Sequence, residues 1–264
     1  MSYETITLTI GDNGVARIVL NRPDAANALD LQMTLDLMDA AIELDHTPEA
    51  RCVVMEGAGG RFFCAGGDLS AFEKAGAKSP QLVKAMTTNL HSAMSRFARG
   101  DAPVIAKVAG TAAGGGLSVA LGCDLIIASD EAKFTMAYTR AGLSPDGSSS
   151  FYLPRLVGLR RAYDLALTNR VLSAAEAEDW GMINRVVPAA ELDAFVDDMA
   201  AQLAAGPTAA FGRTKRLLLE GSSNSFETQM EKESRAIAKS VASEDGKEGL
   251  NAFLNKRKPV FKGR

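Results

Sequence analysis

The stretch VIAKVAGTAAGGGLSVALGCDLIIAS, residues 104–129, contains the pattern that decides the fold class. VIAKVAG and CDLIIAS are short apolar runs that predict buried strands, and GGGLSVALG between them predicts an apolar helix that begins at three glycines. Strands without a polar face need cover on both sides. The stretch therefore indicates a layered α/β fold with strands buried between helices.

The three glycines, Gly114, Gly115 and Gly116, raise a question about function, because the nearest reactive side chain that follows them is Ser118. The first turn of a helix has unpaired backbone N–H groups, and glycine allows a ligand to approach them closely. CAGGD, residues 64–68, is a second glycine-rich turn between a predicted strand and a predicted helix. Either turn alone could be a tight connection, but together they could form an oxyanion hole.

Upstream of this stretch, strand and helix patterns alternate. TITLTI and VARIVL flank GDNG and predict a β-hairpin. Residues 31–42 have the apolar spacing of an amphipathic helix that Asp30 could cap, and CVVMEG predicts a buried strand. Ser70 and Glu73 stand in capping-box register before a helix, and a longer helix is predicted over about residues 81–99.

After about Phe151 the strand patterns almost stop, and only MINRVV resembles a strand. Helical patterns cover residues 156–168, 173–181, 190–205, 207–220 and 225–243. The chain is therefore expected to divide into a β-rich core, residues 1–200, and a helical C-terminal region, residues 201–264.

The composition excludes several classes of protein. The chain has 264 residues, a formal net charge of −3 and no apolar run of membrane-spanning length, so neither nucleic acid nor a membrane is an expected partner. With only two histidines, a histidine-rich metal site is excluded. Three cysteines without metal-ligand spacing, and no targeting pattern, favour the cytoplasm.

Six motifs together resemble the enoyl-CoA hydratase/isomerase family, the crotonase superfamily, over essentially the whole chain. They are NRPDAANAL, FCAGGDL, the stretch 104–129, GLSPDGSSSFYLPRLVG, WGMINRVV and FLNKRKPVF. The resemblance implies an α/β crotonase (ClpP-like) spiral of β-β-α units with a C-terminal helical trimerisation region, assembled as a homotrimer or a dimer of trimers. It also implies an acyl-CoA thioester substrate, in which coenzyme A is part of the substrate and no metal or separate cofactor is needed.

The same resemblance implies that the backbone N–H groups of Gly67 and Gly115 bind the thioester oxygen. It further implies contacts to the substrate from Ala25, Ala26, Ala65, Gly67, Asp68, Leu69, Ser70, Gly115, Phe253 and Lys256. Phe253 and Lys256 would act partly from a neighbouring subunit. Judged from the residues alone, Asp68 predicts a helix cap and Lys256 a solvated basic tail.

The chain departs from the hydratase pattern at two positions. Hydratases of this family use two glutamates where this sequence has Ser118 and Tyr138. Adding water to a double bond needs groups that hold, deprotonate and reprotonate the water, and a serine and a tyrosine without a basic partner serve poorly. A simple hydratase is therefore disfavoured.

Asp146, in GLSPDGSSS, is the nearest other carboxylate. In isolation Pro-Asp-Gly predicts only a turn. Members of the family with an aspartate here use it as a single acid–base, as in the ring-epoxide isomerase of phenylacetate catabolism, or as a nucleophile on an aryl ring, helped by a histidine. His91 matches that histidine in register, although its place off the apolar helix stripe also suits a solvent-facing residue. Tyr138 stands where the dehalogenases have tryptophan.

The sequence therefore predicts an acyl-CoA isomerase that shifts a double bond from β,γ to α,β, or catalyses a related ring-epoxide rearrangement. Asp146 is the expected acid–base, with Gly67 and Gly115 as oxyanion donors and Tyr138 and His91 as further catalytic candidates. The alternatives are an aryl-CoA dehalogenase or thioester hydrolase using Asp146 and His91, an atypical hydratase, and a non-catalytic binder. Expected pocket walls are Phe72, Met86, Tyr138 and Phe151.

Overall fold

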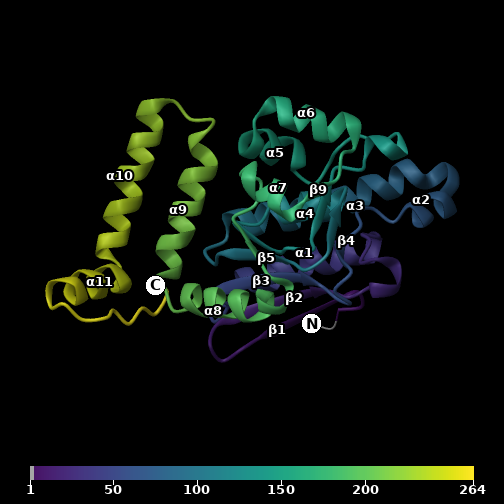
Figure 1. The fold of residues 1–264 in the computed structure, drawn as a ribbon. Helices are drawn as coiled ribbons and strands as arrows, with labels where there is room; N and C mark the ends of the chain where they lie inside the picture. The colour runs from purple at the N-terminus through teal and green to yellow at the C-terminus, as the bar shows by residue number, and fades with distance from the viewer. Residues whose placement is uncertain (1–2) are drawn as a thin grey trace.

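The computed structural model describes residues 3–264 and contains two β-sheets (Figure 1). The larger sheet has six strands in the order β1-β2-β3-β5-β7-β10. These strands are β1 Ile6–Ile10, β2 Val15–Leu20, β3 Cys52–Gly57, β5 Val104–Val108, β7 Leu125–Ser129 and β10 Arg185–Val187. β1 and β2 form the predicted antiparallel hairpin, and the other neighbouring pairs are parallel.

The smaller sheet has four strands in the order β4-β6-β8-β9. They are β4 Phe62–Cys64, β6 Thr111–Ala113, β8 Lys133–Thr135 and β9 Leu172–Ser173. β4, β6 and β8 are parallel, and β9 pairs antiparallel with β8. The run AKFTMAY, residues 132–138, predicts β8. The sequence does not predict β6 and β9, because two or three residues are too few to show an alternating pattern.

The helices of the core are α1 Leu31–Asp45, α2 Leu69–Ala75, α3 Ser79–Arg99, α4 Gly115–Leu121, α5 Ser149–Val157, α6 Leu159–Thr168, α7 Ala174–Asp179 and α8 Leu192–Ala204. Three times the chain adds one strand to the larger sheet, one to the smaller sheet, and then enters a helix: β3-β4-α2, β5-β6-α4 and β7-β8-α5. This repetition is the expected spiral of β-β-α units.

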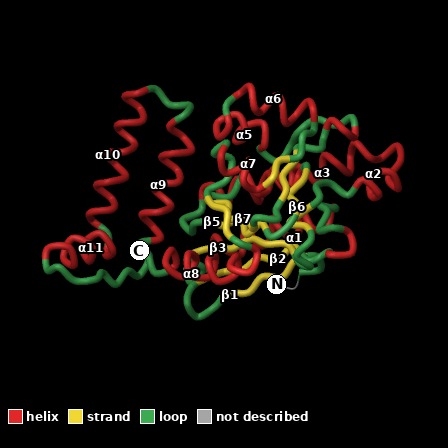
Figure 2. Tube along the Cα trace, in the orientation of Figure 1, coloured by secondary structure: helices red, strands yellow, loops and turns green. Residues whose placement is uncertain are grey.

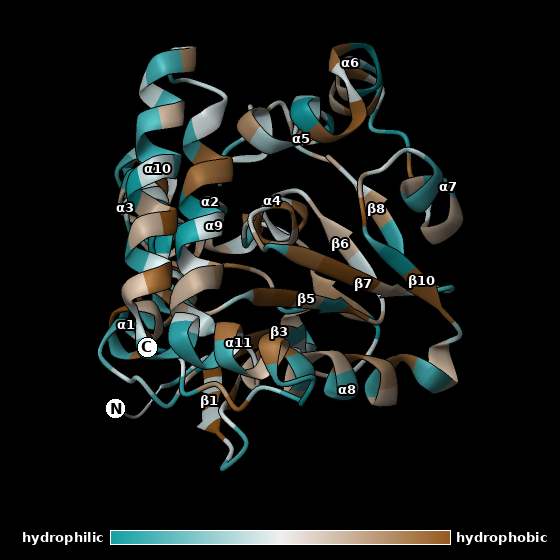
Figure 3. Cartoon of the chain, turned by 90° about the vertical axis from the view of Figure 1, so that its left-hand side faces the viewer, coloured by the Kyte–Doolittle hydropathy of each residue, from teal (hydrophilic) through white to brown (hydrophobic). Residues whose placement is uncertain are grey.

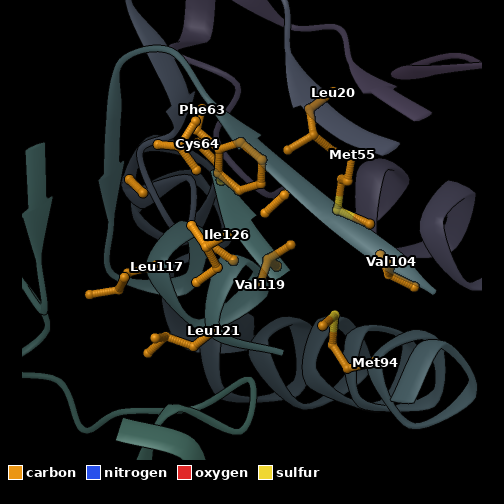
Figure 4. Close-up of a cluster of buried hydrophobic side chains, with 14 of the residues drawn as sticks. Leu20, Met55, Phe63, Cys64, Met94, Val104, Leu117, Val119, Leu121 and Ile126 are labelled. Atoms are coloured by element: carbon orange, nitrogen blue, oxygen red, sulfur yellow. The ribbon is translucent and has the colours of Figure 1, made fainter. Parts of the chain in front are cut away.

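The central strands β3, β5 and β7 of the larger sheet are buried on both faces, as their apolar runs predicted. Val53 and Met55 of β3 point into the main core, whereas Cys52 and Val54 belong to a second cluster formed with α8. Figure 4 shows part of the main core, where Phe63 and Cys64 of the smaller sheet lie near Leu117 and other residues of α4. Figure 3 shows β5 and β7 as hydrophobic strands at the centre of the molecule.

Three C-terminal helices extend to one side of the strands (Figure 2). They are α9 Thr208–Gly221, α10 Phe226–Ala242 and α11 Glu244–Leu254. Lys215 attaches α9 to the core, because its Nζ lies 2.7 Å from Asp124 Oδ2 and donates to the carbonyl oxygens of Phe97 and Ala102. Within residues 3–264, no helix combines the length and the apolar character needed to span a membrane.

The structure corrects two local predictions. Residues 156–168 form two helices, because Gly158 has a φ of +78° that interrupts the helical backbone. The cap of α2 is Asp68, whose side chain accepts from the N–H groups of Ser70 and Ala71, so the capping box expected at Ser70 is wrong. The expected cap of α1 by Asp30 is confirmed. The run SAAEAEDWG, residues 173–181, also has Ser173 and Glu176 in capping-box register, and the structure confirms this box at the start of α7.

Asp36 attaches the start of the hairpin to α1. Its buried carboxylate accepts from the N–H groups of Glu4 and Thr5, from Thr5 Oγ1 and from Gln32. Burial raises the pKa of Asp36, but the hydrogen bonds from Thr5, Gln32 and Glu4 outweigh it and leave the pKa below its ordinary value.

We expect Asp36→Ala to lower the free energy of unfolding by about 3 kcal/mol at pH 7, because it removes charge-assisted hydrogen bonds and leaves the buried N–H of Thr5 unpaired. The wild-type advantage should be fully present above the unfolded aspartate pKa of about 3.9 and shrink as the pH falls below it, since the folded pKa is the lower one. Urea unfolding at pH 7 and pH 3 measures this. Asp12→Ala, in the exposed hairpin turn, is the control, and equal losses in both variants would contradict the assignment.

Candidate active site

The two glycine-rich turns meet in the folded chain. Gly115 is the first residue of α4, and Gly67 directly precedes Asp68, the cap of α2. A Cβ placed on Gly115 would lie 3.7 Å from the backbone nitrogen of Gly67. Neither amide donates to an acceptor within the part of the chain that the structure describes. An oxyanion hole needs two such free N–H donors at neighbouring positions.

The three glycines have three different roles in this turn. Gly114 has a φ of +50°, a backbone conformation that side chains disfavour, and its N–H donates to Thr135. Gly116 lets α4 touch β4, because a Cβ there would lie 2.1 Å from the carbonyl oxygen of Cys64. Gly115 between them carries the free N–H. The run of glycines thus brings the amide of Gly115 beside that of Gly67.

Both amides lie in a cavity of about 340 Å³. Its walls come from the segment before α1, from α1, α2 and α3, from the two glycine turns, and from the loop after β8. They are Leu29, Thr34, Ala65, Gly66, Gly67, Leu69, Phe72, Val83, Met86, Thr87, Leu90, Gly114, Gly115, Ala137, Tyr138, Ala141, Leu143, Ser144 and Asp146. Within residues 3–264, Asp146 is the one carboxylate among these walls, and no lysine, arginine or histidine joins it.

Tyr138, which is itself hydrogen-bonded to Ser118, holds this carboxylate from one side. Tyr138 Oη donates to Asp146 Oδ1 at 2.6 Å and lies 2.8 Å from Oγ of the fully buried Ser118. Burial raises the pKa of Tyr138, and the negative charge and hydrogen bond of Asp146 raise it further. The phenol therefore keeps its proton and remains a donor. Asp146 Oδ2 accepts no hydrogen bond from residues 3–264 and is the oxygen left for a ligand.

The backbone after Asp146 turns in an unusual conformation. Gly147 and Ser148 both have positive φ values, +60° and +75°. The N–H of Gly147 donates to His91 Nε2 at 3.2 Å, and Ser149 Oγ donates to the carbonyl of Asp146 at 3.0 Å. His91 itself comes from α3 and does not line the cavity. The structure therefore places His91 behind the Asp146 turn.

A network of polar groups supports the turn that carries Gly67. The Arg22 guanidinium lies 3.0 Å from Asp68 and 3.2 Å from Asp30, the caps of α2 and α1. Burial raises the pKa of Asp68, but Ser70 and Arg22 outweigh it and leave the pKa below its ordinary value. Sequence reasoning missed Arg22, although it lies within the motif NRPDAANAL. Its contact with Asp68 joins residues 46 positions apart, which spacing alone does not reveal.

Most of the predicted site residues come together. Ala65, Gly67, Leu69, Gly115, Tyr138 and Asp146 line the cavity. Ala26 lies beside it, since the carbonyl of Ala26 accepts from the N–H of Ala65, whereas Ala25 does not line the cavity. Asp68 and Ser70 form the start of α2 without lining the cavity.

Phe253 and Lys256 are not near this cavity. Phe253 lies on α11, Lys256 follows it, and α11 stands on the opposite side of the molecule from α2 (Figure 1). Phe253 is 83% exposed. Among the expected walls, Phe72, Met86 and Tyr138 line the cavity and Phe151 does not. The sequence analysis missed Val83, Thr87 and Leu90. Val83 and Leu90 lie three and four residues from Met86, so helical spacing could have found them, whereas Thr87 directly follows Met86 and no such spacing points to it.

Comparison with known proteins adds a family match. A family model described as enoyl-CoA hydratase/isomerase matches residues 11–264. A 1,2-epoxyphenylacetyl-CoA isomerase of Escherichia coli is 36% identical over 255 residues, 96% of this chain and 97% of that protein. A 4-chlorobenzoyl coenzyme A dehalogenase-2 of an Arthrobacter species is 38% identical over 245 residues, 92% of this chain and 88% of that protein.

A solved structure extends the match to the fold. The crystal structure of an enoyl-CoA hydratase from Bacillus anthracis has a TM-score of 0.92 and 32% identity, and the alignment covers 99% of this chain and 100% of that one. The three relatives are thus named for three different reactions of coenzyme A compounds.

We expect Gly116→Ala to lower the free energy of unfolding by about 1–3 kcal/mol, because its Cβ would overlap the backbone of β4. Urea unfolding measures this. Gly249→Ala in α11 is the matched control, since its Cβ would meet only an ordinary contact with Phe261 at 3.4 Å and alanine favours the helix. An unchanged stability of Gly116→Ala would contradict the close approach of α4 and β4.

Proposed function

The chain belongs to the enoyl-CoA hydratase/isomerase family, the crotonase superfamily, and from this premise we propose that it is an acyl-CoA isomerase that moves a double bond from the β,γ to the α,β position. The expected family and its spiral of β-β-α units are confirmed. The observation that carries the proposal is the lone carboxylate: Asp146 is the one charged side chain that lines the cavity within residues 3–264. A 1,3 proton shift needs one base, whereas hydration needs additional groups to manage a water.

In this proposal, the N–H groups of Gly67 and Gly115 bind the thioester oxygen. Removal of an α-proton from the acyl group puts negative charge on that oxygen, giving a dienolate. Preorganised backbone donors stabilise such charge where it develops, and one donor of this kind is worth about 3–4 kcal/mol. Both amides are free to donate to the substrate because neither has an acceptor within residues 3–264.

Asp146 then moves the proton. Its carboxylate takes the proton from the α-carbon and returns it to the γ-carbon, so the double bond shifts and the carboxylate is regenerated. Oδ2 suits this role, because Tyr138 engages Oδ1 and leaves Oδ2 without a donor from residues 3–264. Tyr138 orients the carboxylate and remains protonated itself, since its pKa is raised. A ring-epoxide rearrangement of a coenzyme A ester would use the same groups.

The walls favour an uncharged, apolar acyl group. Phe72, Val83, Met86 and Leu90 line the cavity, and Leu69 and Leu143 line it while remaining 53% and 42% exposed. Apolar side chains of this kind are stabilised when a ligand covers them. Coenzyme A would be part of the substrate. We place the activity in the cytoplasm, which suits three unpaired cysteines.

The hydrolytic alternatives have weaker support. Dehalogenation or thioester hydrolysis through Asp146 and His91 would need the imidazole as a base near the reacting atoms. His91 lies outside the cavity, and its Nε2 already accepts from Gly147. The two-glutamate hydratase mechanism lacks both carboxylates, because Ser118 and Tyr138 occupy those positions.

We further propose a trimer or a pair of trimers formed through the C-terminal helices. Apolar side chains of these helices that are at least half exposed are Leu218, Phe226, Met230, Ile237, Leu250, Phe253 and Leu254. An exposed apolar surface of this extent marks an association site in soluble proteins. In such an assembly, Phe253 and Lys256 could reach a neighbouring subunit's cavity, although they lie far from their own.

We expect Asp146→Asn to lower isomerase turnover by about 100-fold or more, because the amide keeps the size and polarity of the side chain but cannot carry the proton. Binding of the coenzyme A ester should be nearly unchanged. The measurement is turnover of a β,γ-enoyl-CoA, with loss of the α-proton followed in deuterated solvent. Asp179→Asn, on the exposed end of α7, is the control.

The isomerase proposal is wrong if Asp146→Asn keeps wild-type turnover. It also fails if the active wild type neither exchanges an α-proton with solvent nor transfers one along the chain. Crotonyl-CoA provides the test against hydration, since a turnover of ~10 per second or more would be typical of a good enzyme. That result would restore the hydratase alternative.

Ile237→Asp should shift the protein from trimers or hexamers towards monomers, because it buries a charge in the proposed interface. Sedimentation velocity at micromolar concentration measures the change. Lys239→Glu is the matched control, since it lies two residues further along α10 on another face of the helix. A monomeric wild type would refute the assembly.

A further inference from the structure

The hydrogen bond between His91 and Gly147 connects α3 to the turn that carries Asp146. The N–H of Gly147 donates to His91 Nε2 at 3.2 Å. For Nε2 to accept, the imidazole must be neutral with its hydrogen on Nδ1. Because Gly147 directly follows Asp146, the imidazole holds the backbone one residue from the carboxylate.

This turn needs external support because its backbone is strained. Gly147 has a φ of +60°, and Ser148, which has a side chain, has a φ of +75°. Such a conformation costs about 1–3 kcal/mol in a residue other than glycine and persists only where the surroundings impose it. On the other side of the turn, a Cβ on Gly147 would lie 2.9 Å from Cβ of Ser118. The turn is therefore held between α3 and α4.

Asp146 also lies between two cavities that are lined by different residues. It lines the apolar cavity with the two glycine amides, and it lines a second cleft of about 610 Å³ that further charged side chains also line. His91 lies in that second cleft together with Ser95, Arg99 and Glu220. The imidazole is thus on the far side of the Asp146 turn from the free amides of Gly67 and Gly115.

We propose that His91 is a positioning residue: its Nε2 acts as a fixed acceptor that holds the Asp146–Gly147 backbone, so that the Asp146 carboxylate faces the apolar cavity. The inference rests on the proposed acid–base role of Asp146. It assigns no proton transfer to His91. Tyr138 fixes the side chain of Asp146 through Oδ1, and His91 fixes the backbone that follows it.

Four substitutions separate this role from that of a base. Gln at position 91 carries an acceptor oxygen at nearly the reach of Nε2 but cannot take up a proton, so H91Q should keep turnover within about twofold of wild type. Asn is one methylene shorter, and Ala has no acceptor, so H91N and H91A should each lower kcat by about tenfold with KM nearly unchanged. S95A is the matched control, since Ser95 lies one turn further along α3 in the same cleft, and it should behave as wild type.

Hydrogen–deuterium exchange gives a readout that does not depend on any reaction. Peptides spanning residues 143–151 should exchange faster in H91A and H91N and at the wild-type rate in H91Q and S95A. Thermal unfolding of each variant checks that the chain remains folded. H91Q and H91N differ by one methylene, so their comparison stands even if H91A unfolds.

Three outcomes would overturn the inference. If H91Q is as slow as H91A, the imidazole carries a proton, and the hydrolytic alternatives gain. If all variants have wild-type kcat, the bond to Gly147 does not position Asp146. If exchange over residues 143–151 is unchanged in H91A, His91 does not hold the turn. An inactive wild type with faster exchange in H91A would instead refute the isomerase proposal alone and leave the structural role of His91 intact.

Discussion

The close backbone approach between the two glycine turns is the constraint on which the rest of the site depends. A Cβ on Gly116 would lie 2.1 Å from the carbonyl oxygen of Cys64, and a Cβ on Gly66 would lie 3.0 Å from that of Ala113. Backbone in contact with backbone leaves no room for side chains. This contact brings the first turn of α4 against the end of β4, and the amides of Gly67 and Gly115 come together as a result.

The position of Asp146 follows from the same contact. Its turn packs through Gly147 on Ser118 of α4, and Tyr138, which follows β8, reaches both Ser118 and Asp146. A buried polar group needs partners, and the fully buried Ser118 finds one in Tyr138. Where the family's hydratases have carboxylates, this chain thus has a neutral hydrogen-bonded pair that supports one carboxylate. With a single charge, the cavity is suited to one proton carrier.

Local patterns were sufficient for much of the fold. Apolar runs predicted β3, β5 and β7, helical spacing predicted α1 and α3, and Asp30 and Asp68 were recognised as caps. The short strands β6 and β9 were not predicted, because a run of two or three residues shows no periodicity. Such strands are recognised only by their pairing with neighbouring strands in the sheet. The break at Gly158 was not predicted either, because the apolar spacing continues across it and does not reveal its positive φ.

The sequence by itself determined the fold class and the two glycine turns, because each depends on residues close together in the chain. Asp146 became a candidate through the family resemblance, since Pro-Asp-Gly alone predicts only a turn. Only the tertiary structure decided which groups meet. It connects Tyr138 to Ser118 over 20 positions and His91 to Gly147 over 56, and it leaves Phe253 and Lys256 far from the cavity of their own chain. Spacing along a chain fixes the face of a helix or strand on which a side chain lies, but the partner across that face depends on how the elements pack.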